Sequence, residues 1–283
     1  MKIATPLAAV AAISLLATGA SAQSAKFAAT YDTDVRMISI SVDGADPGCV
    51  ELPGVDLVLG TEDDVTFCGA HAGPIAEAEI ASLHVANWKE LLMGVSAQIN
   101  LVTFTQAKGK NGGGTSTAVA EGTVRAGTLV VPEGTGSVGM CSAAFAAYDG
   151  GVNAFSAPGP VTFASRRQEL SVTVDLDVVG AIDDETLDDD LAALLDIEGS
   201  VTVALGLDTT AAHHFNFVAA NLTSGWYDVI ACYDLTALAE VSGMTIDADT
   251  SAYSKAALGP RIITVQEVRA TKTGILDESG SGN

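Results

Sequence analysis

The sequence predicts a mainly β protein: an antiparallel β-sandwich of jelly-roll or immunoglobulin-like Greek-key type, with one short helix. Three observations support this fold class. Several segments alternate apolar and polar residues, breaks rich in Gly or Pro separate them, and four cysteines suit an exported chain with disulfides. Strands with one apolar and one wet face pack as antiparallel sheets, face to face.

The predicted strands share a two-residue period, in which every second residue is apolar. They are found at residues 95–101, 171–178, 201–207, 227–235 and, less regularly, 261–270. Turn signals lie between them at Gly109–Gly114, Pro132–Gly139 and Pro158–Pro160. A domain boundary at Gly150–Pro160, which is rich in Gly and Pro, is an alternative, but a Cys141–Cys232 disulfide would cross it. We therefore favour one large sandwich over residues 76–283, to which residues 23–75 add N-terminal strands and a small disulfide loop.

The short helix is predicted within an acidic stretch. Thr186 and Asp189 fit a capping box, after which Leu187, Leu191, Leu194 and Leu195 recur at helical spacing. The acids at residues 183–190 then lie in or before a first helical turn, where the helix dipole favours them. The alternative is a calcium site with Asp183, Asp184 and Asp188 as candidate ligands, although the EF-hand pattern is absent. No other cofactor is predicted.

The amino terminus has the pattern of a secretory signal peptide. Lys2 precedes an apolar run from Ala4 to Leu16, and Ala20-Ser21-Ala22 provides small residues at a cleavage site. This predicts removal of residues 1–22 and a secreted, extracellular or cell-surface protein, with the periplasm as an alternative. The apolar run is shorter than the roughly 20 residues that a membrane span needs, so no membrane span is expected.

Two disulfides are expected from the four cysteines, and three pairings are open. Proximity favours Cys49–Cys68, which leaves Cys141–Cys232. A zinc site is the rival interpretation, but the sequence has no C-x-x-C pair and its histidines lie far from the cysteines.

The chain is strongly acidic, with 35 Asp and Glu against 13 Lys and Arg. Nucleic acid is excluded as a partner on this ground, because phosphate binding needs basic side chains. No Lys or Arg occurs between Gln168 and Ser254. Divalent cations are expected to relieve the repulsion in that stretch.

Motifs that resemble catalytic or nucleotide sites have simpler explanations. Gly134-x-Gly136-x-x-Gly139 matches the dinucleotide fingerprint by letter, but it follows Pro132 and is interpreted as a turn. The loop Lys108–Gly114 lacks the ending of a P-loop and is interpreted as a hairpin tip. Without a G-x-S-x-G motif, no catalytic residue is assigned.

The histidines and tryptophans are the remaining candidates. His213 and His214 are neighbours on one strand, so they point to opposite faces and cannot jointly bind a metal from one face. Trp88 and Trp226 are candidates for stacking against sugar rings, the alternative being ordinary core or boundary positions.

A short string fixes one corner of the fold. Leu222-x-x-Gly225-x-Tyr227-x-Val229 resembles the corner before a late strand of immunoglobulin-like sandwiches, where a Tyr hydroxyl bonds to nearby backbone. The strand before it, His213–Ala219, is expected to pair through this turn.

Four longer strings carry a resemblance to a group of exported β-rich proteins from environmental bacteria. They are Trp88–Ser96, Lys108–Gly113, Ala211–Phe217 and Thr264–Ala270. The resemblance implies an extracellular, β-rich chain and no particular activity, substrate or site.

We therefore predict a non-enzymatic, exported protein of structural or adhesion type that assembles with itself as a homo-oligomer or filament. The alternative is a soluble β-sandwich module that binds a cell-surface glycan or calcium. A hydrolase is a third hypothesis, which would require convergent carboxylates or a metal in a cleft.

Overall fold

The computed structural model describes residues 27–45, 49–52, 65–86, 89–110, 115–173, 200–243 and 249–268. Seven of its strands are long, with 13 to 23 residues each. In chain order the elements are β1 (Phe27–Asp32), β2 (Arg36–Asp43), β3 (Val50–Leu52), β4 (Val65–Val85), β5 (Lys89–Lys110), β6 (Thr115–Pro132), α1 (Val138–Asp149), β7 (Val161–Thr173), β8 (Ser200–Leu222), β9 (Gly225–Gly243) and β10 (Ser251–Val268).

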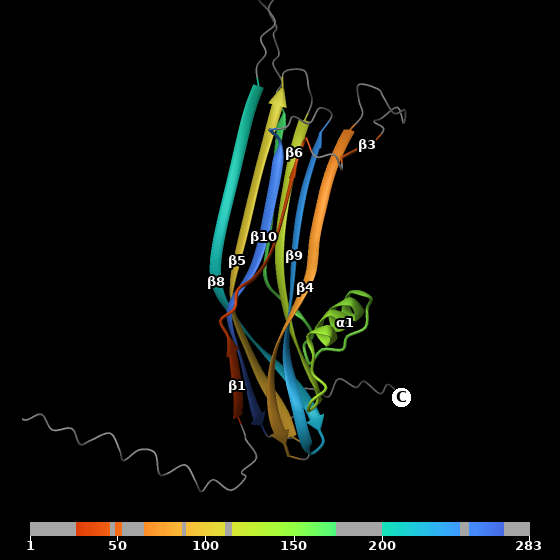
Figure 1. The fold of residues 1–283 in the computed structure, drawn as a ribbon, viewed down its shortest axis with the longest axis vertical. Helices are drawn as coiled ribbons and strands as arrows, with labels where there is room; N and C mark the ends of the chain where they lie inside the picture. Colours follow the sequence, from red (N-terminus) through yellow and green to blue (C-terminus); the bar gives the residue numbers. More distant parts are fainter. Residues whose placement is uncertain are drawn as a thin grey trace, which may run out of the picture.

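The strands form two antiparallel sheets that lie face to face (Figure 1). The first sheet has the order β1-β10-β5-β8, and β2 continues the line of β1 along the same side of β10. The second sheet has the order β3-β4-β9-β6-β7. The predicted fold class, an antiparallel β-sandwich with a short helix, is thus confirmed. The predicted section boundary at residue 75 falls inside β4.

Alternation places the apolar core between the sheets as the sequence indicates. Val95, Ala97, Ile99 and Leu101 are all buried on β5. On β9 the run from Asp228 to Leu235 is buried on both faces, because the first sheet packs on one side and α1 covers part of the other. The residues 174–178 that continue the predicted strand after β7 lie outside the described part.

The buried residues of the sandwich differ between its two halves, which lie below and above the bend of β4 in the view of Figure 1. The lower half holds large apolar side chains, among them Leu83, Met93, Phe217 and Ile263. In the upper half most interior residues are small or polar, although Val42, Leu101 and Val241 are also buried there. The small or polar residues are Thr103, Thr105, Ala107, Ser116, Ala118, Ala120, Ala239, Ala252, Ser254 and Ala256. Small side chains let the two sheets approach closely.

Hydrogen bonds join the two sheets across this narrow upper interior. Ser254 Oγ on β10 donates to the carbonyl oxygen of Glu121 on β6 over 2.6 Å. Gln168 on β7 accepts from Thr103 Oγ1 at 2.8 Å, and its amide donates to Thr105 Oγ1 at 2.7 Å and to the Leu205 carbonyl oxygen at 2.6 Å. Buried polar groups need such partners, so these bonds fix the spacing of the sheets.

Both sheets bend at a common level, which we call the waist. In β4 the bend is at Gly73–Pro74, and in β10 it is at Gly259–Pro260; both sites are register irregularities. Gly73 has a φ of 99°, and a Cβ there would lie 2.5 Å from the Leu235 carbonyl oxygen. Only glycine fits at this position.

The described helix, α1, follows the break predicted at Pro132–Gly139. The expected turn is present at residues 133–137, and α1 begins at Val138, although its N-cap residue Ser137 makes no side-chain capping bond. Tertiary contacts replace the missing local signal: Phe145 packs against Phe155 and Ile230 on the outer face of the second sheet. The helix predicted near residues 187–195 lies outside the described residues.

The disulfides are the two pairings that proximity favoured. Cys49, next to β3, bonds to Cys68 on β4, and Cys141 on α1 bonds to Cys232 on β9. The second bond attaches the helix to the sheet beneath it. The described part of the chain contains no free cysteine, which indicates folding in an oxidising environment.

The corner predicted at Tyr227 is confirmed, because the Tyr227 hydroxyl donates to the carbonyl oxygen of Thr223 over 3.1 Å. The expected pairing through this turn is wrong. β8 belongs to the first sheet and β9 to the second, so the corner carries the chain from one sheet to the other. A one-sided apolar pattern does not distinguish a hairpin from a crossing between sheets.

Candidate functional site

The functional features of this sandwich lie along its edges. On one side the edge strands are β1 and β2 in the first sheet and, in the second, β3 beside residues 65–67 of β4 and β4 itself beyond them; on the other side they are β8 and β7. An edge strand presents unpaired backbone groups to other chains, and proteins usually protect it with charges, Pro, bulges or inward-pointing carboxylates.

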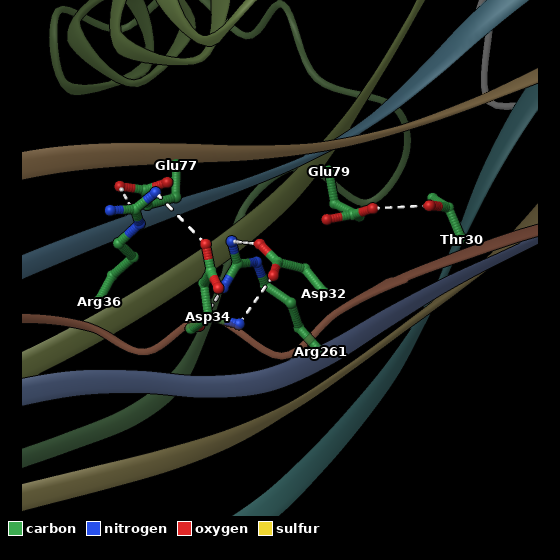
Figure 2. Close-up of polar contacts among 7 residues, drawn as sticks. All are labelled: Thr30, Asp32, Asp34, Arg36, Glu77, Glu79 and Arg261. Carbon is green, nitrogen blue, oxygen red and sulfur yellow. Dashed lines mark hydrogen bonds and ion pairs between the residues drawn. The ribbon is translucent and has the colours of Figure 1, made fainter.

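At the waist, Arg261 attaches the junction between β1 and β2 to β10 (Figure 2). Its side chain is almost fully buried and donates to the Asp32 carboxylate and, over 3.0 Å, to the Asp34 carbonyl oxygen. The Asp34 backbone N–H, 2.7 Å from Asp32 Oδ1, and the Arg261 charge hold the pKa of Asp32 below its usual value. These contacts hold the junction between β1 and β2 against β10.

A second group of contacts links the same junction to β4. Arg36 Nε lies 3.4 Å from Glu77 Oε1, and Thr30 Oγ1 donates to Glu79 Oε1 over 2.8 Å (Figure 2). Glu77 stands opposite Tyr233 on β9 in the strand register, so its side chain points to the inner face of the sheet. This edge therefore combines a proline, a bulge and inward-pointing carboxylates.

A buried tyrosine lies beside this cluster. Tyr233 is fully buried, its hydroxyl has no hydrogen-bond partner among the described residues, and the Arg261 guanidinium lies 5.9 Å from its ring centroid. Burial raises the pKa of the Tyr233 hydroxyl. The neutral phenol is thus the form the interior favours.

The β7 edge carries charges of both signs. Arg167 lies 3.5 Å from Glu121 Oε2 and 3.3 Å from Glu169 Oε2, and these hydrogen bonds raise the pKa of Arg167. Such exposed ion pairs contribute little to stability. Their charges nevertheless oppose the addition of an apolar strand.

The β8 edge differs from the other three. Its 23 residues contain no Lys, Arg or Pro and a single acid, Asp208. The described chain places no strand along its outer side; an isolated bridge between Ala157 and Val218 closes only its lower end. Four apolar side chains of the upper half remain 40–49% exposed: Val201, Val203, Leu205 and Leu207. The alternation of this strand was predicted from the sequence, but no described residue shields its apolar side chains fully from solvent.

The glycine motif at Gly134 and Gly136 holds a carboxylate of the protein itself. Both backbone N–H groups donate to Asp228 Oδ2, at 2.7 and 3.3 Å, and Ser82 Oγ donates to Asp228 Oδ1 at 2.7 Å. The Ser82 hydroxyl and these N–H groups lower the pKa of Asp228. A phosphate would need the same donors, so the interpretation as a structural turn agrees with this arrangement.

Of the predicted glycan and metal residues, the described part of the chain includes Trp226. Trp226 is half exposed, with its ring centroid 5.3 Å from that of His84. Trp88, Asp183, Asp184 and Asp188 lie outside the described residues, so stacking on sugars and calcium binding stay predictions. Within the described ranges there is no group of three His, Cys, Asp or Glu side chains arranged for a metal ion.

Sequence analysis missed a polar chain on the outer face of the first sheet. Ser96 Oγ lies 2.7 Å from His214 Nδ1, and His214 Nε2 lies 3.1 Å from Asn216 Oδ1. The order resembles a nucleophile, a base and an orienting group. However, β5 is an inner strand of its sheet, which commits the backbone N–H groups beside Ser96 to strand pairing. An oxyanion would therefore lack donors there.

A second missed cluster anchors the helix. Arg125 on β6 donates to both carboxylate oxygens of Asp149 at 2.6 and 2.9 Å, and its Nε donates to Asp234 at 2.8 Å. The bonds to Asp149 raise the pKa of Arg125, and burial raises that of Asp234. Together with the Cys141–Cys232 bond, this cluster fixes α1 on the sheet.

Comparison with known proteins gives no relative: no family model matches the chain, and no curated protein or solved structure is significantly similar to it. In the described part of the chain, no helix has the length and apolar character needed to cross a membrane.

Proposed function

We propose that this chain is an exported, non-enzymatic protein of structural or adhesion type whose copies assemble through the open edge of β8. One observation carries the proposal. Three of the four sheet edges carry bulges, proline or charges, whereas the 23-residue edge of β8 has one charged residue and an exposed apolar row.

The compartment fits this proposal. Two disulfides suit an oxidising environment, and the amino-terminal pattern predicts export. The strong acidity keeps most of the surface apart from other copies, because like charges repel. Contact is then favoured where charge is scarce, along β8.

Light scattering on a sizing column tests the proposal with protein that begins at Gln23. We expect the unmodified chain to form species larger than a monomer, increasingly so at higher concentration. Leu205→Lys places a charge in the exposed apolar row and should leave a monomer. Leu205 is 44% exposed, so a lysine fits there without disturbing the fold.

Ser171→Lys is the matched control, because it adds the same charge to the exposed face of the β7 edge. It should assemble as the unmodified chain does. A monomeric unmodified protein, or a Leu205→Lys variant that assembles normally, would contradict the proposal.

A further inference from the structure

We infer that β8 pairs with β8 of a second copy, antiparallel and about a two-fold axis at Ala204, which closes the assembly at two copies through this edge. The inference rests on the proposed function and adds the partner and the register. It follows from three observations: the direction of the backbone groups of β8, the position of its apolar row, and the protection of the other edges.

The backbone direction comes from the bridge at the lower end of β8. Val218 N–H donates to the Ala157 carbonyl oxygen at 2.9 Å, and Ala157 N–H donates to the Val218 carbonyl oxygen at 3.1 Å. Val218 therefore points both backbone groups away from β5. The register between β5 and β8 is unbroken from Ser200 to Ala219. Because backbone direction alternates along a strand, the even-numbered residues of β8 offer their N–H and C=O groups to a partner.

The side chains point by the same alternation. Val203, Leu205 and Leu207 stand opposite Ala107, Thr105 and Thr103 of β5, which are fully buried. The odd-numbered side chains of β8 therefore lie on the interior face of the first sheet, at the edge where no described strand follows β8. A strand added beside β8 would extend this interior and cover the row.

In one antiparallel register, the apolar row of β8 in each copy lies beside the same row of the other copy. With Ala204 opposite Ala204 of the second copy, Val203 faces Leu205 and Val201 faces Leu207, in both directions. Asp208 then faces Ser200 of the second copy, so the only charge of β8 does not meet its equivalent. Ala204 is even-numbered and its backbone groups point outward, which makes the central pair a hydrogen-bonded one.

The protection of the other edges selects this partner. β4 carries Glu77 and Glu79 on its inner face and the bulge at Gly73–Pro74, while the junction of β1 and β2 is held by Arg261. β7 carries Arg167 and Glu169. Among the edges of the described strands this leaves like-with-like pairing of β8, and an interface of this type is two-fold symmetric and closes.

Ala204→Cys tests the register. Two opposite Cα atoms in a hydrogen-bonded pair lie about 5.5 Å apart, within the range of a disulfide. We expect mild oxidation to give a covalent dimer on a non-reducing gel. Ala212→Cys is the matched control on the same face of β8, because residue 212 and its equivalent would be separated by roughly 50 Å.

A second pair of variants gives an independent reading. Val203→Cys and Leu205→Cys face each other in this register, so a mixture should form mainly crosslinks between the two variants. Neither variant alone should dimerise as completely as the mixture.

The outcomes separate the two proposals. If the unmodified protein assembles and Leu205→Lys abolishes assembly, but Ala204→Cys fails to crosslink, the two-fold register is overturned and assembly through β8 stands. Equal crosslinking of Ala204→Cys and Ala212→Cys would also overturn the register. A protein that stays monomeric overturns both.

Discussion

The two long sides of the sandwich are built differently. On the side of β1, β2 and β4, Arg36–Glu77 and Thr30–Glu79 join the two sheets, and Arg261 holds the junction of β1 and β2 within the first sheet. On the side of β8 and β7, Gln168 and Arg166 join β7 to β8, through the Leu205 carbonyl oxygen and Thr209 Oγ1, and the apolar row of β8 stays exposed. The described part of the chain holds both edges of the first side by side-chain contacts, whereas it places no strand along the outer side of β8.

Bulges and inward-pointing charges indicate a protected edge where they are present, and their absence indicates an edge that another chain can join. A bulge interrupts the ladder, and inward charges make a neighbouring strand costly. Where both are absent over a long strand, pairing with another chain is favoured. Three changes test how much each side depends on its own contacts, in order of expected effect.

Gln168→Leu removes three buried hydrogen bonds that join β7 to β5 and β8, and it should have the largest effect. Thr103 and Thr105 would keep buried hydroxyls without this partner, so we expect a loss of about 3 kcal/mol in the free energy of unfolding. Urea denaturation followed by circular dichroism measures it. Gln266→Leu, on an exposed position of β10, is the control and should change little. Equal losses for both variants would show that the joining bonds do not matter.

Arg261→Ala opens the opposite side. The change removes a charged donor from the Asp34 carbonyl oxygen and from Asp32, and hydrogen bonds to charged groups contribute about 1.5–3 kcal/mol. We expect a loss of about 2 kcal/mol and faster hydrogen exchange in β1 and β2. Arg167→Ala, on the exposed β7 edge, should leave both unchanged. Unaltered exchange in β1 and β2 after Arg261→Ala would refute the role of this side chain.

A pH series distinguishes the two sides more finely. The pKa of Asp32 is lower in the folded chain than its ordinary value of 3.8, so its contribution to stability is complete above that value. The contribution is lost as the pH falls through the lowered pKa, because the unfolded chain binds the proton first. Asp32→Asn should therefore show a shallower loss of stability in acid than the unmodified chain. Identical slopes in thermal unfolding between pH 2 and 5 would contradict this.

Local pattern predicted the strands well but not what covers them. The alternation at 201–207 correctly indicated a strand with one apolar face, yet the same pattern describes a covered strand and an open edge. Its signal was present in the sequence: a run of 23 residues with only Asp208 charged. Similarly, the string Asp32-Thr-Asp-Val-Arg36 interrupts an apolar alternation and so marks the break between β1 and β2. Nothing in that string indicates that Arg261 is the partner of Asp32.

The sequence alone predicted the antiparallel sandwich, the Cys49–Cys68 pair and the corner at Tyr227, because periodicity, neighbouring cysteines and turn residues act over short distances; the Cys141–Cys232 pair followed by elimination. The tertiary structure decided the rest. It placed α1 at Val138 through a disulfide and Phe145, brought Arg261 to Asp32 from 229 residues away, and left β8 at an edge. Strand order and edge position depend on contacts between distant segments, which no local pattern encodes.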